Sequence, residues 1–190
     1  MTAVGPLFEA VSGRKARDPV SPGWAVLSPC DTYRYTLGRA WAEGDRCALF
    51  ICLNPSTADA DEDDPTLRRL IGFAKREKCA QLEVVNLFGF RSPKPGDLLT
   101  ATDPVGPLND RHVAEAAARA ALIVVGWGIA LAKPGRGLDL LEARVRAVRE
   151  LLAGYDLHAL GLTADGYPRH PLYLRQDAPL ALFASRRGVA

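Results

Sequence analysis

The sequence predicts an α/β protein of three layers, in which a central four-stranded parallel sheet lies between helices. Four short apolar segments have the length of buried strands: 47–53, 82–88, 121–127 and 157–162. Segments with helical periodicity separate them, which is the pattern of β-α-β units. Right-handed crossovers between such units bring the carboxyl ends of all four strands to one edge of the sheet.

The N-terminal part of the chain differs from this pattern. Residues 1–22 mix glycine, proline, serine and charge without periodicity, so we expect a loose N-terminal arm ahead of a single α/β domain over 23–190. Residues 24–27 and 33–41 alternate well enough to be two strands, which predicts an N-terminal β-hairpin.

Three segments between or beside the strands predict helices. Asp64 followed by Pro65 is a typical helix start, and apolar residues at helical spacing come after it. An alanine-rich helix is expected to start at Asn109 or Asp110 and to run through Arg119. Residues 138–152 have the clearest amphipathic pattern, which Gly154 ends.

Composition limits the class of protein. A net charge of +2 permits an anionic partner without demanding one. The apolar runs are too short to span a bilayer, and we expect no signal peptide and no membrane partner. No CxxC pair occurs, and no histidine lies at ligand spacing from a cysteine, which argues against zinc or an iron–sulfur cluster. We therefore expect a cytoplasmic protein with reduced thiols and without a metal or cofactor.

Polar and aromatic residues follow the predicted strands, at the edge where ligands bind in open α/β sheets. An asparagine amide reads a donor and an acceptor on a nucleobase edge, and an aromatic ring stacks on its face. An asparagine can also orient a water, and a histidine can donate to a departing base. The candidate catalytic residues are Asn54 and His170, and the candidate substrate-binding residues are Pro55, Ser56, Asn86, Phe88, Arg91 and Trp127.

Each candidate also has a structural interpretation. Asn54-Pro55 can be a simple strand-to-loop stop, and Asn86 can be a strand-end cap. Trp127 can belong to the core, and His170 can hold its own loop by hydrogen bonding. The acidic loop 59–64 can bind a hard cation, or it can be a solvated loop whose last residues complement a helix dipole.

Several motifs resemble a bacterial and phage family of unknown function over about residues 24–174. The motifs are Leu-Asn-Pro-Ser-Thr-Ala-Asp, Asp-Asp-Pro-Thr, Val-Asn-Leu-Phe, Asp-Pro-Val-Gly-Pro and His-Pro-Leu-Tyr-Leu. More distantly, the order of motifs resembles the uracil-DNA glycosylase superfamily. Leu53-Asn54-Pro55-Ser56 is similar to the Gly-Ile-Asn-Pro-Gly motif of its mismatch-specific branch, with Leu53 in place of a residue that is usually glycine.

This second resemblance implies roles for three residues. Asn54 would position the hydrolytic water, and Asn86 would bind the base. His170, in a His-Pro pair like the one that opens the DNA-contacting loop, would stabilise the departing base. The resemblance also implies a four-stranded parallel sheet and a reaction without metal.

Three functions are therefore expected from the sequence, in decreasing order. The first is an N-glycosidic hydrolase of the uracil-DNA glycosylase type, acting on a nucleobase in DNA or a nucleotide. The second is a non-catalytic module that binds a nucleotide or nucleic acid in the same pocket. The third is a metal-assisted nucleotide enzyme that uses Asp59, Asp61 and Asp64.

Overall fold

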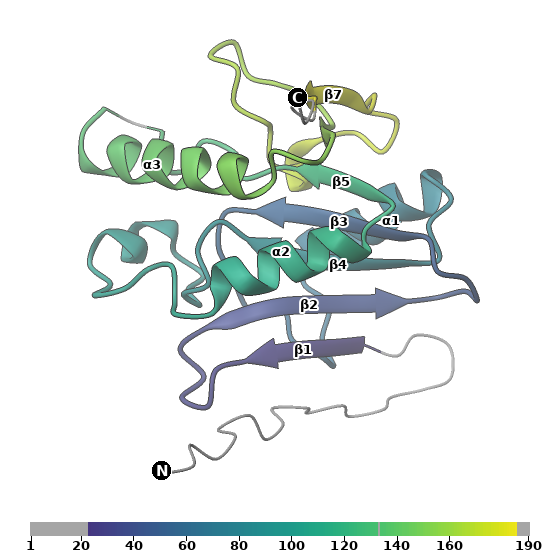
Figure 1. The fold of residues 1–190 in the computed structure, drawn as a ribbon, viewed down its shortest axis with the longest axis horizontal. Coiled ribbons are helices and arrows are strands. Elements are labelled where there is room, and N and C mark those ends of the chain that lie inside the picture. Colours follow the sequence, from purple (N-terminus) through teal and green to yellow (C-terminus); the bar gives the residue numbers. More distant parts are fainter. Residues whose placement is uncertain (1–22, 133, 186–190) are drawn as a thin grey trace, which may run out of the picture.

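A computed structural model describes residues 23–132 and 134–185. The described chain is an α/β fold built on one mixed sheet (Figure 1). Its strands are β1 (Gly23–Leu27), β2 (Arg34–Ala40), β3 (Cys47–Cys52), β4 (Gln81–Asn86), β5 (Leu122–Val125), β6 (Leu157–Ala159) and β7 (Ala181–Ala184). Its α-helices are α1 (Pro65–Arg76), α2 (Asn109–Arg119) and α3 (Arg136–Leu151), and two short 3₁₀ helices span Pro95–Leu99 and Pro171–Tyr173.

The sheet has seven strands in the order β1-β2-β4-β3-β5-β6-β7. The four expected strands are parallel and adjacent to one another, as β4, β3, β5 and β6. The expectation that they make up the whole sheet is wrong. The hairpin β1–β2 joins the edge of β4 in antiparallel pairing, and β7 adds antiparallel to β6. These additions hydrogen-bond backbone groups that the two outer parallel strands would otherwise leave unpaired.

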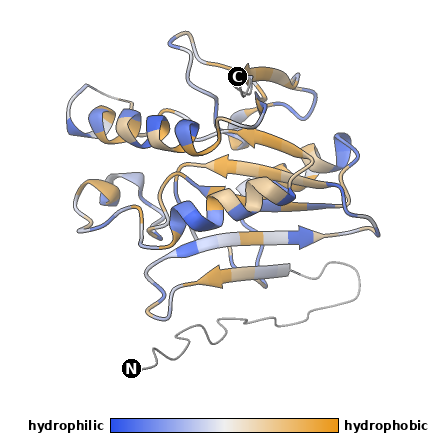
Figure 2. Cartoon of the chain, viewed as in Figure 1, coloured by the Kyte–Doolittle hydropathy of each residue, from blue (hydrophilic) through white to orange (hydrophobic). Residues whose placement is uncertain are grey.

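Helices cover both faces of the sheet, and each face has its own core. Leu49 and Ile51 of β3 pack with residues of α2 and α3, whereas Phe50 of the same strand packs with Leu70 and Phe73 of α1. This division follows from the alternation of side chains along a strand. Because both faces of β3 are buried, the strand is apolar along its whole length. The central strands are largely hydrophobic in Figure 2, where α2 crosses in front of them.

Local sequence explains where the helices begin. The Asp64 carboxylate caps α1 by accepting a hydrogen bond from the Leu67 N–H at 2.7 Å, and Pro65 occupies the first turn. Helix α2 begins at Asn109, the first of the two expected starts. Helix α3 begins at Arg136, two residues before the expected start, directly after Gly135 with its positive φ of 113°.

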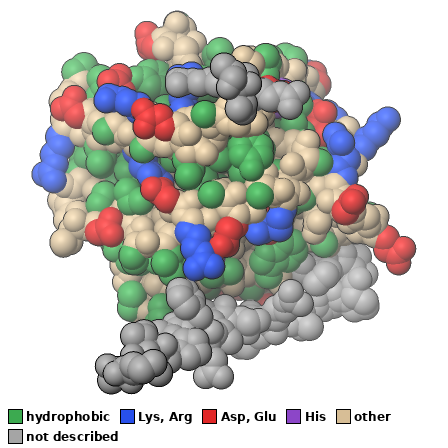
Figure 3. All heavy atoms as spheres, in the orientation of Figure 1, with side chains coloured by type: hydrophobic (Ala, Val, Ile, Leu, Met, Phe, Trp, Pro, Cys, Tyr) green, Lys and Arg blue, Asp and Glu red, His purple; other side chains and the backbone are tan. Residues whose placement is uncertain are grey.

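The expected N-terminal arm, residues 1–22, lies outside the described residues. Within the described residues, we find no helix with the length and apolar character that crossing a membrane requires. On the face that carries α2 and α3, acidic and basic side chains are intermixed (Figure 3). The described part of this face therefore carries no extended patch of positive charge that would select an anionic ligand.

Candidate active site

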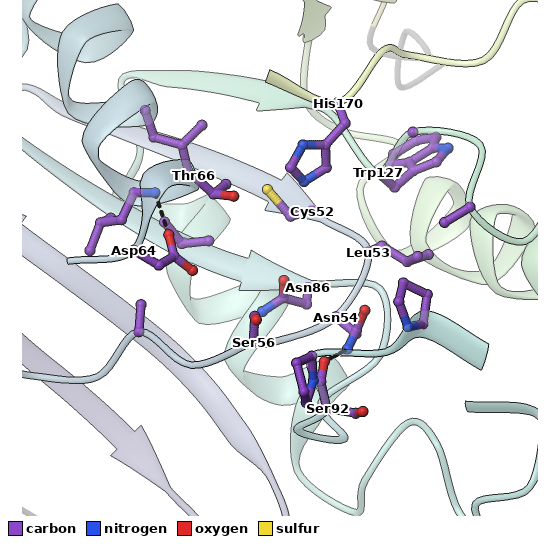
Figure 4. Close-up of a pocket in the computed structure, with 18 of the residues that line it drawn as sticks. Cys52, Leu53, Asn54, Ser56, Asp64, Thr66, Asn86, Ser92, Trp127 and His170 are labelled. Carbon is purple, nitrogen blue, oxygen red and sulfur yellow. Dashed lines mark hydrogen bonds between the residues drawn. The ribbon is translucent and has the colours of Figure 1, made fainter. Parts of the chain in front are cut away.

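A cavity of about 560 Å³ opens beyond the carboxyl ends of the parallel strands (Figure 4). This size lies within the range of about 300–1,000 Å³ that is usual for small-molecule sites. Five of the residues predicted from the sequence line it: Asn54, Ser56, Asn86, Trp127 and His170. Residues of α1 and of the hairpin strand β2 complete its wall, among them Thr66, Leu67 and Arg34.

Parallel pairing brings three of these residues together. Cys52 of β3 pairs with Asn86 of β4, and Ile51 pairs with Val125 of β5. Asn54 and Trp127 each follow their strand by two residues, so they reach the same edge of the sheet as Asn86. This is the edge at which α/β sheets bind their ligands.

His170 comes to this edge because two glycines let its loop approach. A Cβ on Gly126 would lie 2.8 Å from Cδ of Pro171, which is closer than such atoms pack. Gly128 has a φ of +69°, and a Cβ there would lie 3.0 Å from Cβ of His170. The Gly-Trp-Gly sequence therefore allows the His170 loop to lie against the end of β5.

The Asn54 side chain is fixed with a defined orientation. Its Nδ2 donates to the carbonyl oxygens of Pro55 at 3.1 Å and Ser92 at 2.8 Å. Both amide hydrogens are therefore used, and Oδ1 remains as an acceptor on the pocket side (Figure 4). A water hydrogen-bonded to this oxygen would be held at one place in the cavity.

Asn86 presents an amide whose donors lack a partner. The side chain is 1% exposed, and among the described residues no acceptor pairs with its Nδ2. Its backbone carbonyl is satisfied by the side chain of Asn109 at 3.0 Å. Leaving a buried donor unpaired costs about 1–3 kcal/mol. Asn86 lies at the centre of the labelled side chains in Figure 4, where an acceptor on a ligand would remove this cost.

His170 is held as a neutral hydrogen-bond donor. Its Nδ1 accepts from the Leu172 N–H at 3.3 Å, which assigns the proton to Nε2. Burial lowers the pKa of His170, and the nearby Asp64 carboxylate only partly opposes this effect. The ring points into the cavity (Figure 4), so Nε2–H is available to an acceptor there.

Three of the predicted substrate-binding residues do not line the cavity: Pro55, Phe88 and Arg91. Phe88 is fully buried in the core on the α2–α3 side, so the expectation that it stacks on a base is wrong. Arg91 donates to the carbonyl of Asp31 at 3.4 Å. Trp127 is both wall and core, because its ring also meets Phe183 edge to face at 5.8 Å.

Sequence reasoning missed several residues of the wall. Arg34 lies in a segment that the sequence predicts only as a strand, and Asp64 is expected as a helix cap or as one carboxylate of a metal site, yet both line the cavity. Ser92 lines it too and holds Asn54 through its backbone carbonyl. Cys52 also lines the wall, but burial raises its pKa to about 12, so it stays a thiol and is not a nucleophile at neutral pH.

The acidic loop folds on its own contacts. Asp59 accepts from the N–H groups of Asp61 and Glu62, both at 2.8 Å. Burial acts to raise the pKa of Asp59, but these hydrogen bonds and the charge of Arg39 outweigh it, and the pKa is lowered. Asp63 pairs with Arg39 at 2.8 Å. Within the ranges the structure describes, we find no group of three or more potential metal-binding side chains, so the acidic loop lends no support to a metal site.

Capping by Asp64 can be separated from its charge by two substitutions. Asp64→Ala removes the acceptor for the Leu67 N–H, and we expect it to lower the free energy of unfolding by about 1 kcal/mol. Asp64→Asn keeps an acceptor oxygen at this position and should stay close to the wild type. Urea unfolding of both variants measures the difference. Equal losses in the two would contradict the capping role.

Stability should fall in mildly acidic solution because of His112 and His170. Burial lowers the pKa of both below the ordinary value of 6.5. Below that value the unfolded chain takes up these protons first, so stability decreases as the pH falls towards the lowered folded-state pKa values. His112 stacks on Tyr35 at 4.9 Å, outside the cavity. We expect His112→Phe to lose less stability than the wild type between about pH 7.5 and pH 5.5; an unchanged pH dependence in urea unfolding would refute this.

Comparison with known proteins gives one match. Residues 34–172 match the model of a family described as a protein of unknown function, DUF1643. No curated protein and no solved structure matches the chain. All eight residues predicted for the site lie within the matched range.

Proposed function

Because the chain belongs to the DUF1643 family, whose function is unknown, we propose an activity from the cavity itself: hydrolysis of the N-glycosidic bond between a nucleobase and its sugar. The substrate is a nucleotide or a nucleotide unit of DNA. One observation supports this most. A fixed acceptor on Asn54, an unpaired amide on Asn86 and a neutral donor on His170 face one cavity from three separate segments.

In the proposed reaction, a water molecule donates a hydrogen bond to Oδ1 of Asn54 and attacks C1′ of the sugar. The bond from C1′ to the base nitrogen breaks, and its electron pair leaves with the base. His170 Nε2–H donates to a carbonyl oxygen of that base and stabilises the negative charge that develops there. The attacking water loses one proton to solvent and becomes a hydroxyl group on C1′. The departing base anion takes up one proton from solvent and is released as a neutral free base.

Asn86 selects the base in this scheme. Its Nδ2 donates to an acceptor on the base edge and so gains the partner that it lacks among the described residues. The walls contributed by Leu67, Trp127 and the aliphatic residues near them suit a flat, largely apolar ring. The volume of about 560 Å³ accommodates a base with its sugar.

A second candidate is a module that binds a nucleotide without chemistry. Asn54 is an amide and cannot take a proton from water, as a carboxylate would. Among the described residues of the cavity wall, Asp64 alone carries a carboxylate, and one of its oxygens already accepts from the Leu67 N–H. The same pocket would then hold a nucleotide and leave it intact.

The test is a panel of nucleotides and of single- and double-stranded oligonucleotides that carry natural and modified bases. Free base is measured by mass spectrometry, and abasic sites by alkaline strand cleavage. Base release by the wild type but not by Asn54→Ala supports the hydrolase. Tight binding without release favours the binding module. Neither binding nor release across the panel overturns both.

A further inference from the structure

We propose that this cavity binds a phosphate group of its ligand through Arg34, so that the substrate is a phosphorylated nucleotide rather than a free base or nucleoside. The inference rests on the proposed function for the nucleoside part of the ligand only. The phosphate can belong to a free nucleotide or to a nucleic-acid backbone, because both offer the same anionic oxygens.

Arg34 differs from the other buried arginines of the described chain in its lack of a carboxylate partner. Three arginines are buried within the described residues, namely Arg34, Arg39 and Arg144. Arg39 pairs with Asp63 at 2.8 Å, and Arg144 pairs with Asp110. Arg34 is 4% exposed, and no ion pair joins it to a described carboxylate. Buried charges are normally paired, so the exception needs an explanation.

The hydrogen bonds of Arg34 are also incomplete. Its Nη1 donates to the carbonyl oxygen of Ala58, but its buried Nε has no acceptor among the described residues. A guanidinium carries five N–H donors in a planar fork that fits two oxygens of a phosphate. A small movement of this side chain towards a bound phosphate would give its unused donors charged acceptors.

The surroundings favour an anion. Burial lowers the pKa of Arg34 to about 10, with attraction to Asp64 opposing this and repulsion from Arg91 adding to it. Arg34 therefore stays charged at neutral pH at an energetic cost that a bound anion would relieve. Arg169 also lines the cavity, so the part of the wall that the structure describes carries two arginines and one carboxylate, that of Asp64.

Helix α1 adds to this potential. Its first turn, with Thr66 and Leu67, lines the cavity, and the N-terminal end of a helix carries partial positive charge. Arg34 supplies what a helix end alone does not, namely a buried polar group without a partner in the wall of the same cavity. Together they make this side of the pocket the place for an anionic group.

The competing explanation is that Arg34 only supports the loop that follows β3, through its bond to Ala58. The two explanations predict opposite effects on stability. If Arg34 is a structural clamp, Arg34→Met lowers the free energy of unfolding. If it is an unpaired charge kept for a ligand, an apolar side chain of similar length leaves stability unchanged or raises it while binding is lost.

Calorimetric titration of the full chain with four 2′-deoxynucleoside 5′-monophosphates and the four matching nucleosides tests the proposal. We expect the wild type to bind at least one monophosphate ten or more times more tightly than its nucleoside. Arg34→Met should abolish this preference, and Arg34→Lys should keep part of it. The preference should persist in Asn54→Ala, since binding needs no turnover. If the protein released no base, the preference for monophosphates over nucleosides could therefore still be measured.

Two further arms identify the source of the phosphate. A dinucleotide without terminal phosphates offers only a backbone diester, and inorganic phosphate offers the anion alone. Tighter binding of the dinucleotide than of the monophosphate assigns the site to nucleic acid, and the reverse assigns it to free nucleotides. An equal affinity of the wild type for nucleotides and nucleosides overturns the proposal. A loss of stability in both Arg34→Met and Arg34→Lys, with the phosphate preference retained, overturns it as well.

Discussion

Asn54→Ala should reduce base release by about 10²-fold or more while the protein stays folded. The reason is the geometry of the amide. Both of its N–H donors are used by the carbonyls of Pro55 and Ser92, which fixes the direction of Oδ1 into the cavity. Removing that oxygen leaves the water without a fixed place beside the sugar, and rates are sensitive to displacements of about 1 Å.

The substitution needs a control in the same part of the fold. Lys94→Ala removes an exposed side chain from the turn that carries Ser92 and keeps the Lys94 backbone N–H that donates to Ser92 Oγ. We expect this variant to retain near-wild-type rates. Release of the same base at the same rate by Asn54→Ala would exclude Asn54 from the chemistry, and circular dichroism and thermal unfolding would show that both variants are folded.

The parallel strands and their ends were accessible from the sequence because of two regular physical rules. Buried parallel strands are apolar throughout, and their carboxyl ends meet at one edge of the sheet. Asn54, Asn86 and Trp127 follow from these rules, and all three line the cavity. His170 was reached through the polar loop after the last of these strands, and the glycines beside Trp127 explain why that loop comes close.

The edges of the sheet and part of the wall were not accessible in this way. The spacing of apolar residues indicates a strand but does not indicate which neighbour that strand pairs with. The pairing of β2 with β4 and of β7 with β6 is therefore determined by tertiary packing. Phe88 was misplaced for a related reason. It lies two residues past Asn86, beyond the end of β4, and the strand alone does not determine which side of the sheet such a residue faces.

Arg34 shows the limit most clearly. In sequence it is a charged residue in an alternating segment, where solvent exposure is the usual outcome. Its burial depends on where the hairpin joins the sheet, and its role in the wall depends on α1 and the loop before it. A charge without a partner is recognised only when all its neighbours are placed, so the sequence pattern around Arg34 does not by itself indicate a phosphate site.

His170→Asn should lower base release by about 10²-fold or more, with little change in stability. An asparagine oxygen can replace Nδ1 as the acceptor for the Leu172 N–H, so the start of the short helix Pro171–Tyr173 keeps its cap. The shorter side chain cannot reach where Nε2–H lies. His170→Gln places an amide N–H nearer that point and should retain more activity than His170→Asn. The reverse order would contradict donation from Nε2.

The pH profile separates this role from a structural one. Burial lowers the pKa of His170, so the ring stays neutral and the wild type should keep its activity somewhat below pH 6.5. At lower pH, protonated Nδ1 can no longer accept from Leu172, and the ring loses the contact that aims Nε2–H into the cavity. We therefore expect activity to fall on the acid side in the wild type, whereas His170→Gln, which has no titrating group at this position, should lack that component. An identical acid limb in both proteins would assign the titration to another group and remove His170 from the reaction.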